Sequence, residues 1–87
     1  MTQLWTRVGD CGEYESWGDD LAALLDYLNE LHVGQVDHWR PGGLETCNYW
    51  SYDYISIYWG DPDGNLIDDL TTAERTIVEA GLEEAYI

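Results

Sequence analysis

A leucine-rich stretch in the first half of the chain indicates a helix. Leucines recur there every three or four residues, which places them on one face of an α-helix and predicts that this face packs in the core. They are Leu21, Leu24, Leu25, Leu28 and Leu31. Side chains suited to N-capping precede the stretch and a glycine follows it, at Ser16, Asp19, Asp20 and Gly34. The stretch therefore has a start signal, an apolar face and a stop signal.

A second helix is predicted close to the C-terminus. Residues 71–74 read Thr-x-x-Glu, the pattern of a capping box, in which two side chains satisfy backbone N–H groups at the helix start. The apolar residues expected to face inward are Ala73, Ile77, Val78, Leu82 and Ala85. Gly81 lowers the helix propensity of the last turn by about 1 kcal/mol relative to alanine. The last turn is therefore the weakest part of this helix.

Three segments have the composition of β-strands. Residues 4–8 form a short β-prone run that glycines stop. Residues 35–39 form another, ahead of a loop predicted at residues 41–43. Residues 49–59 give the clearest strand signal, because they are rich in aromatic and β-branched side chains.

The alternation within residues 49–59 divides the side chains between two faces of a strand. One face, with Ile55, Ile57 and Trp59, is expected to pack against the leucine helix. Two further tryptophans, Trp5 and Trp17, are expected in the same core. The other face is expected to lie toward solvent or a partner, and it carries Trp50, Tyr52, Tyr54 and Tyr58.

A hairpin is predicted after this strand. Residues 61–64 read Asp-Pro-Asp-Gly, a turn in which proline presets φ and glycine accepts the left-handed conformation, so the chain should return through residues 65–67. The elements then follow the order strand, helix, three strands, helix. This order predicts an α+β fold, with a small antiparallel sheet of three to four strands packed against two helices. The 87 residues are expected to form one compact acidic domain over residues 1–87.

The charge of the chain is extreme for a folded protein. Eighteen Asp and Glu residues stand against three arginines and no lysine, for a formal net charge of -15. High net charge usually indicates disorder, but 45% of the residues are hydrophobic and five are tryptophan, so the chain can bury enough apolar surface to fold. An ordinary small domain carries a net charge of about 2 to 8 in magnitude. A surface so one-sided repels nucleic acid and anionic membranes and attracts a basic cleft.

The carboxylates are predicted to form a binding surface. Neighbouring positions on one helix face lie about 5 to 6 Å apart, so a row of carboxylates can imitate the phosphates that nucleic-acid-binding proteins bind electrostatically. The acids predicted to act in this way are Asp19, Asp26, Glu30, Asp61, Asp63, Asp68, Asp69, Glu79 and Glu83. The tyrosines predicted to supply desolvated anchors are Tyr52, Tyr54 and Tyr58.

In size, acidity and lack of lysine, the chain resembles the small acidic inhibitors of phages and mobile elements. These include anti-CRISPR, antirestriction and uracil-DNA-glycosylase inhibitor proteins, several of which are DNA mimics. The resemblance covers the whole chain, rests on overall character and carries over no individual residue. It implies an inhibitor that evades host defence by occupying the basic surface of a CRISPR effector or, as a second choice, of a restriction or repair enzyme.

Three other interpretations of the acidity stay open. Charges on outer helix faces are usually only a solvated surface. Adaptation to high salt also replaces lysine with acidic residues. A third interpretation is that the aromatic strand binds a protein partner or a second copy in a homodimer, with the acidity serving solubility. A stability profile across salt concentration separates high-salt adaptation from a binding surface.

Catalytic and metal-binding patterns are sparse, so we expect neither an enzyme nor a cofactor. His32, His38 and Cys47 match no zinc-ligand spacing, and His32 is expected in the last turn of the first helix, where the helix dipole favours an imidazole. Residues 61–65 resemble the start of an EF-hand loop, but the later glycine and glutamate are missing. Cys11 and Cys47 are expected to be reduced thiols, and a disulfide between them is the alternative.

The sequence also predicts where the protein acts. Residues 1–8 lack the basic and apolar regions of a secretory signal, and no stretch approaches the roughly 18 to 20 apolar residues of a membrane span. We expect a cytoplasmic protein, in the host cell if the chain is phage-encoded. We expect no membrane partner and no direct binding of nucleic acid.

Overall fold

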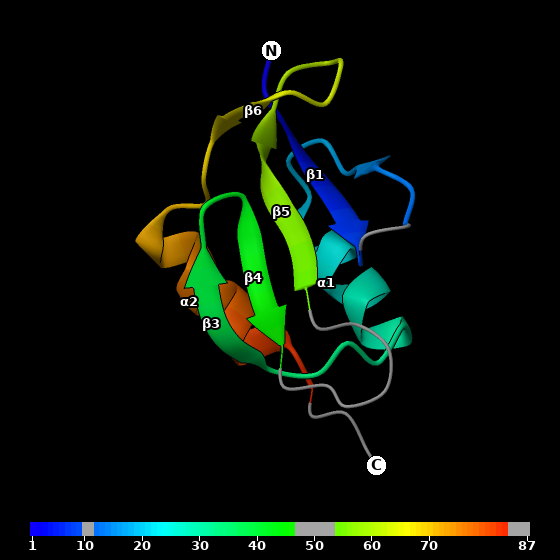
Figure 1. Ribbon diagram of the computed structural model, residues 1–87, viewed down its shortest axis with the longest axis vertical. Helices are drawn as coiled ribbons and strands as arrows, with labels where there is room; N and C mark the ends of the chain where they lie inside the picture. Colours follow the sequence, from blue (N-terminus) through cyan, green and yellow to red (C-terminus); the bar gives the residue numbers. More distant parts are fainter. Residues whose placement is uncertain (10–11, 47–53, 84–87) are drawn as a thin grey trace.

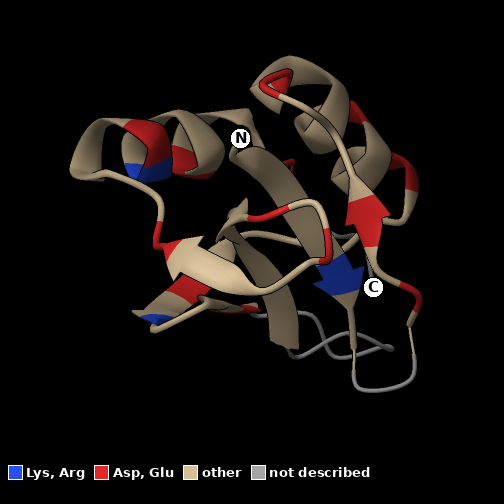
Figure 2. Cartoon of the chain, turned by 90° about the horizontal axis from the view of Figure 1, so that it is seen from above, with Lys and Arg blue, Asp and Glu red and all other residues tan. Residues whose placement is uncertain are grey.

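The chain folds into an α+β structure in which two helices pack on the same face of one antiparallel sheet (Figures 1 and 2). This computed structural model describes residues 1–9, 12–46 and 54–83. Among these residues, no helix has the length and apolar character of a membrane span. The elements are β1 (Gln3–Val8), β2 (Glu15–Ser16), α1 (Leu21–Glu30), β3 (Val36–Arg40), β4 (Gly43–Thr46), β5 (Tyr54–Gly60), β6 (Leu66–Asp68) and α2 (Thr72–Gly81).

The sheet is built around β5. The strand order is β2-β1-β5-β4-β3, and β6 pairs with β5 beside this path. All pairings are antiparallel, and the longest runs between β1 and β5. The predicted antiparallel sheet with two helices is confirmed, but the predicted count of three to four strands is too low, because the described residues form a six-stranded sheet.

The strand that the sequence pattern misses most clearly is β4. A loop is predicted at residues 41–43, yet the turn is complete at Gly42, which has φ 80°, and Gly43 already pairs with Ser56. A Cβ atom on Gly43 would lie 2.1 Å from the carbonyl oxygen of Ile55. Glycine is therefore required at this position by the close approach of two strands, and the last residue of the predicted loop is the first residue of a strand.

The core lies between the sheet and the leucine face of α1, as the sequence predicts. Leu24 and Leu28 have no exposed surface. The helix begins at the predicted acidic pair, because the Oδ1 atom of Asp20 accepts the N–H of Ala23 at 3.0 Å. The sheet residues buried in the same core are Leu4, Val8, Leu44, Ile55 and Ile57.

The capping box of α2 is also present. The Oγ1 atom of Thr71 accepts the N–H of Glu74 at 3.2 Å, and the Oε1 atom of Glu74 accepts the N–H of Thr71 at 2.8 Å. Ala85, which is predicted to face inward, lies outside the described residues. The local signal thus places the start of α2 correctly.

The inner face of α2 differs from the predicted one. Val78 and Leu82 are buried as expected, but Ile77 is 51% exposed and Ala73 is exposed as well. Compared with the predicted orientation, α2 is turned about its axis. Glu74 lies on the inner side, where its carboxylate accepts a hydrogen bond from the indole N–H of Trp59. A specific polar contact has overridden the apolar periodicity.

The tryptophans divide between the two faces of the sheet. Trp17 and Trp59 are partly buried and pack against the core, as predicted. Trp5 lies on the opposite face, where it pairs with Tyr58 across β1 and β5 and its indole N–H donates to the carbonyl oxygen of Asp61 at 2.9 Å. The prediction for Trp5 is wrong because the residues on either side of it in β1 take the buried positions.

The predicted turn at residues 61–64 joins β5 to β6. The N–H of Gly64 donates to the carbonyl oxygen of Asp61 at 3.0 Å, and the N–H of Asp61 donates to the carbonyl oxygen of Asn65 at 3.0 Å. Gly64 has φ 88°, the left-handed conformation that favours glycine. The hairpin prediction is confirmed, with β6 as its return strand.

Candidate functional site

The helix α1 presents an acidic surface. Its flanking and outer carboxylates, Asp19, Asp26 and Glu30, are all exposed. In the described part of the chain, none of these three side chains forms a hydrogen bond or an ion pair. The last turn of α1 contains no basic residue. The three carboxylates therefore face solvent without a partner among the described residues.

A single amide side chain joins this surface to the end of α2. The Nδ2 atom of Asn29 donates to the carbonyl oxygen of Gly81 at 2.8 Å, and its Oδ1 atom accepts the N–H of Glu83 at 2.9 Å. Asp26 lies one helical turn before Asn29, and Glu30 follows it directly. The backbone of the exposed Glu83 is thus held against α1 at Asn29, which lies between these two acids in the sequence. We call Asp26, Glu30 and Glu83 the acidic helix face.

The hairpin acids divide into two structural and two free carboxylates. Asp61 accepts the N–H groups of Asp63 and Asn65, each at 2.9 Å, and the Nδ2 of Asn65 at 3.1 Å. The backbone hydrogen bond from Asn65 is the largest cause that holds the pKa of Asp61 below its usual range. Asp69 accepts the N–H of Gly42 at 2.7 Å. Asp63 and Asp68 are exposed, and their carboxylates have no partner among the described residues.

Carboxylates also fasten α2 to the sheet. The indole N–H of Trp39 donates to Glu79 at 2.5 Å, and that of Trp59 donates to both Oε atoms of Glu74 at 3.1 Å. Burial opposes the ionisation of Glu74, but the hydrogen bonds from Thr71 and Trp59 outweigh it and lower the pKa of Glu74. Glu79 is exposed and Glu74 is partly buried, and both carboxylates accept hydrogen bonds that hold α2 on the sheet. The sequence offers one signal for such contacts, because a buried indole N–H needs an acceptor.

The aromatic strand does not present the expected row of tyrosines. Tyr58 is only 5% exposed, and its hydroxyl donates to the carbonyl oxygen of Gly64 at 2.5 Å. Burial is the largest cause that raises the pKa of Tyr58. The prediction that Tyr58 faces solvent or a partner is wrong, because the hairpin turn contacts it. Tyr54 is partly buried, and Trp50 and Tyr52 lie outside the described residues.

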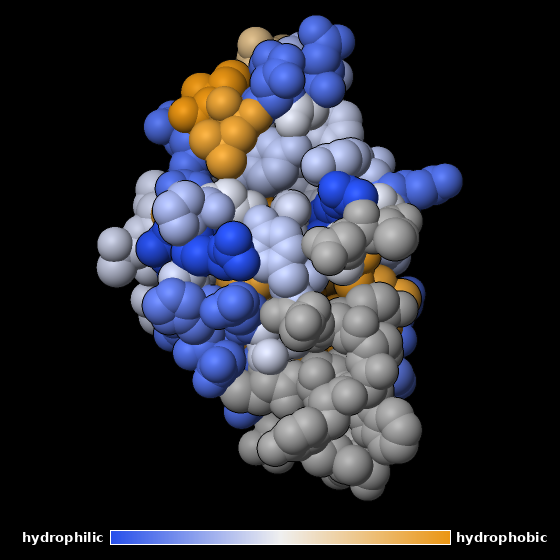
Figure 3. Space-filling model, viewed as in Figure 1, coloured by the Kyte–Doolittle hydropathy of each residue, from blue (hydrophilic) through white to orange (hydrophobic). Residues whose placement is uncertain are grey.

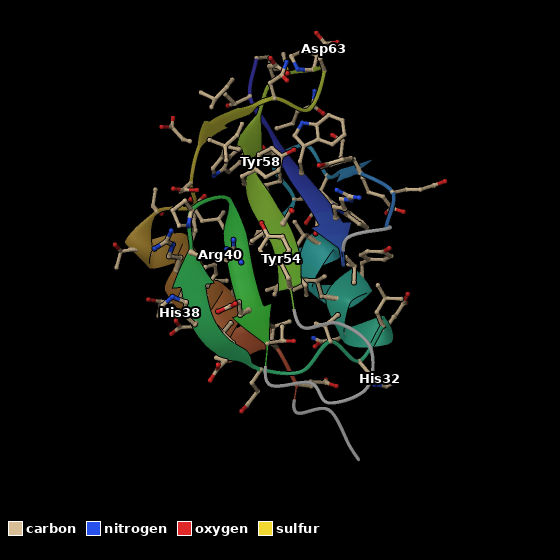
Figure 4. All side chains as sticks on the ribbon, in the orientation of Figure 1. His32, His38, Arg40, Tyr54, Tyr58 and Asp63 are labelled. Carbon is tan, nitrogen blue, oxygen red and sulfur yellow. The ribbon has the colours of Figure 1, made fainter. Side chains whose placement is uncertain are left out.

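The arginines are held by aromatic rings. The guanidinium groups lie 5.1 Å from the Tyr14 ring centroid for Arg7, 4.6 Å from that of Tyr54 for Arg40, and 5.0 Å from that of Trp39 for Arg75. Arg40 also forms a 3.8 Å ion pair with Glu45. Figure 4 shows Arg40 and Tyr54 together on the sheet. No described cation therefore reaches the acidic helix face.

The histidines and cysteines form no described metal site. Within residues 1–9, 12–46 and 54–83, no group of three His, Cys, Asp or Glu residues could hold a metal ion. His32 lies in the turn after α1 with φ 54°, and not in the last helical turn as predicted. His38 is exposed on β3, opposite Glu45. Cys11 and Cys47 lie outside the described residues.

The site therefore consists of exposed carboxylates on two joined helix ends, and of further free carboxylates on the hairpin. Of the predicted contact residues, Asp26 and Glu30 of α1 are linked to Glu83 through the side chain of Asn29. Asp63 lies apart from them in the turn before β6 (Figure 4), and Asp68 pairs with Trp59 in β6. Comparison with protein-family models, curated proteins and solved structures finds no match to this chain.

Proposed function

We propose that this protein binds the positively charged, nucleic-acid-binding surface of another protein through its acidic helix face. The observation that supports this most directly is the set of exposed carboxylates, Asp26, Glu30 and Glu83, without a cationic partner in the described residues. Asp19 extends the same charge toward the start of α1. The described arginines are all engaged elsewhere by aromatic rings.

The position of these acids on the helices favours binding over stability. A helix C-terminus carries a partial negative charge, so carboxylates there are unfavourable and cations are favourable. Both α1 and α2 lack basic residues in their last turns, and Glu30 and Glu83 occupy or follow these ends. The two hydrogen bonds of Asn29 then hold the C-terminal ends of α1 and α2 together. A surface that served only solubility gains nothing from this concentration of charge.

The geometry suits a groove that accepts phosphates. Asp26 and Glu30 are one turn apart, which corresponds to a rise of about 6 Å along the helix axis. A protein groove lined with Lys and Arg binds phosphates mainly by electrostatics, so it attracts a row of carboxylates for the same reason. Binding of this kind excludes nucleic acid by competition.

As the target we propose a nucleic-acid-processing enzyme of host defence or repair. A CRISPR effector is the first choice and a restriction or repair enzyme the second, following the resemblance to small acidic inhibitors. The protein would then act as an inhibitor by occupying the site, without chemistry of its own.

The test is a paired charge reversal. The double variant Asp26→Lys/Glu30→Lys removes charge from the acidic helix face, and Glu13→Lys/Asp37→Lys makes the same charge change at exposed sites away from it. Proteins retained from a bacterial lysate by the tagged wild type are identified at low and high salt. Each is then tested for competition with duplex DNA.

We expect the wild type to retain nucleic-acid-binding proteins at about 50 mM salt and to lose them at about 500 mM, because screening weakens surface charge interactions. The helix-face variant should lose them even at low salt, and the control variant should keep them. Equal retention by both variants would refute the proposed face. Recovery of the chain alone at both salts would instead favour self-association.

A further inference from the structure

The return strand β6 is partly open to solvent on both of its faces. All three of its residues are exposed, with Leu66 51% and Ile67 48% exposed. Successive side chains in a strand point to opposite faces of the sheet, so one of this pair would normally be buried. Figure 3 shows their apolar surface as a patch at the upper left, over β6. The rest of the sheet covers the strand only in part, since the Cδ1 atom of Leu66 lies 3.3 Å from where a Cβ on Gly42 would be.

One edge of β6 is also without a strand partner. Among the described strands it pairs only with β5, through Trp59↔Asp68 and Gly60↔Leu66. The exposed edge of a sheet offers unpaired backbone groups to another chain, and natural proteins usually protect such an edge with charged residues. Here the strand carries one charged residue, Asp68, beside two adjacent apolar residues, Leu66 and Ile67.

The strand is held in place before any partner binds. Asp61 closes the preceding turn with hydrogen bonds from Asp63 and Asn65, and Asp69 anchors the following residues by accepting the N–H of Gly42. A preformed strand loses little conformational freedom on binding. The edge is therefore a ready template for strand addition.

The surrounding charge selects the kind of partner. Asp63, Asp68 and Asp69 are exposed and border the apolar pair. Pairing β6 with β6 of a second copy would bring these acids close to their equivalents, in a chain that already carries a net charge of -15. Like charges across a sheet are destabilising. An occupant with positive charge beside its apolar side chains fits this edge better than a second copy does.

We propose that β6 is a docking strand, which takes an extended basic segment of a partner protein as an added strand of the sheet. Its backbone groups would pair with the free edge, its apolar side chains would contact Leu66 and Ile67, and its Lys or Arg residues would lie near Asp63, Asp68 and Asp69. Three residues of strand span roughly 10 Å, so the segment is short. This surface is separate from the acidic helix face and does not depend on the function proposed for it.

The probe is the end-blocked pentapeptide Arg-Val-Arg-Val-Arg, titrated into the isotope-labelled protein and followed by amide chemical shifts. We expect saturable shift changes centred on residues 66–69. A peptide with its inner amides N-methylated keeps the charge and the side chains but cannot pair as a strand, and it should bind at least about ten-fold more weakly. Ile67→Thr should weaken binding several-fold, whereas Ile77→Thr, at an equally exposed isoleucine of α2, should not.

Four outcomes would overturn this proposal. They are an absence of saturable binding, equal binding of the N-methylated peptide, shift changes centred on α1 and the end of α2, and self-association of the chain that Ile67→Thr abolishes. The third outcome would show that the peptide only senses the acidic helix face. Asp26→Lys/Glu30→Lys should leave binding at β6 intact, so the two proposals can fail separately.

Discussion

Replacing Glu74 with alanine tests whether carboxylate–indole contacts hold α2 on the sheet. The substitution removes two sets of interactions at once. The backbone N–H of Thr71 loses its acceptor at 2.8 Å, and the indole N–H of Trp59 loses both carboxylate oxygens at 3.1 Å. The Oγ1 atom of Thr71 can still accept the N–H of residue 74, so half of the capping box survives.

The expected loss of stability is about 2 kcal/mol. Loss of an N-cap interaction typically costs about 1 kcal/mol. A hydrogen bond to a charged group contributes about 1.5 to 3 kcal/mol, and we reduce this to about 1 kcal/mol because Glu74 is partly solvent-accessible and screened. For a chain of this size the total corresponds to a fall in Tm of about 10 °C.

The assay is urea unfolding at several pH values, followed by tryptophan fluorescence. Because the pKa of Glu74 in the folded protein lies below its ordinary value of 4.5, its contribution is fully present above pH 4.5 and disappears as pH falls through the folded-state pKa. The difference in unfolding free energy between wild type and Glu74→Ala should therefore become smaller at acidic pH. Glu74→Gln should fall between the two, since one amide oxygen cannot replace two carboxylate oxygens.

Glu83→Ala is the matched control, because the Glu83 carboxylate is exposed and has no partner among the described residues. Its unfolding free energy should stay within about 0.5 kcal/mol of wild type. Two results would refute the reasoning. One is an equal loss of unfolding free energy in Glu74→Ala and Glu83→Ala, and the other is a difference between wild type and Glu74→Ala that does not change with pH.

Three further changes test other parts of the fold. Asn29→Ala should lower the unfolding free energy by about 1 to 2 kcal/mol in urea titrations, because it removes both hydrogen bonds to the end of α2. An unchanged urea midpoint would show that these hydrogen bonds do not stabilise the fold. Gly43→Ala should destabilise the protein by about 1 to 3 kcal/mol, because its Cβ would overlap the Ile55 carbonyl; a thermal scan that matches wild type would argue against this close approach. Tm should rise between about 10 mM and 500 mM salt as repulsion is screened, whereas a requirement for molar salt would indicate high-salt adaptation.

Local signals in the sequence predicted the elements well. The leucine spacing, the capping box and the Asp-Pro-Asp-Gly turn each depend on residues a few positions apart, and all three are present in the structure. β4 was missed because its first residue, Gly43, follows Pro41 and Gly42 and so resembles part of a loop, and only the pairing with β5 makes it a strand residue.

The candidate site was predicted less completely, because its contacts join residues distant in sequence. No periodicity reveals that Trp59 will bind Glu74 and so rotate α2, or that the hairpin turn will bury Tyr58. The acids of α1 were correctly expected to be exposed, since they lie on the polar side of a clear apolar stripe. The link between these acids and Glu83 depends on the side chain of Asn29, whose hydrogen-bond partners lie more than fifty positions away in the sequence.

The pair of hydrogen bonds between Asn29 and the end of α2 has a consequence for redesign of the protein. It fixes the separation of the two helix ends through backbone atoms of Gly81 and Glu83, and so without any help from the charged side chains. The carboxylates can therefore be exchanged for other groups while the scaffold beneath them stays the same. Exchanges at Asp26, Glu30 and Glu83 should therefore change the charge of this end of the molecule while the two hydrogen bonds from Asn29 to the backbone stay in place.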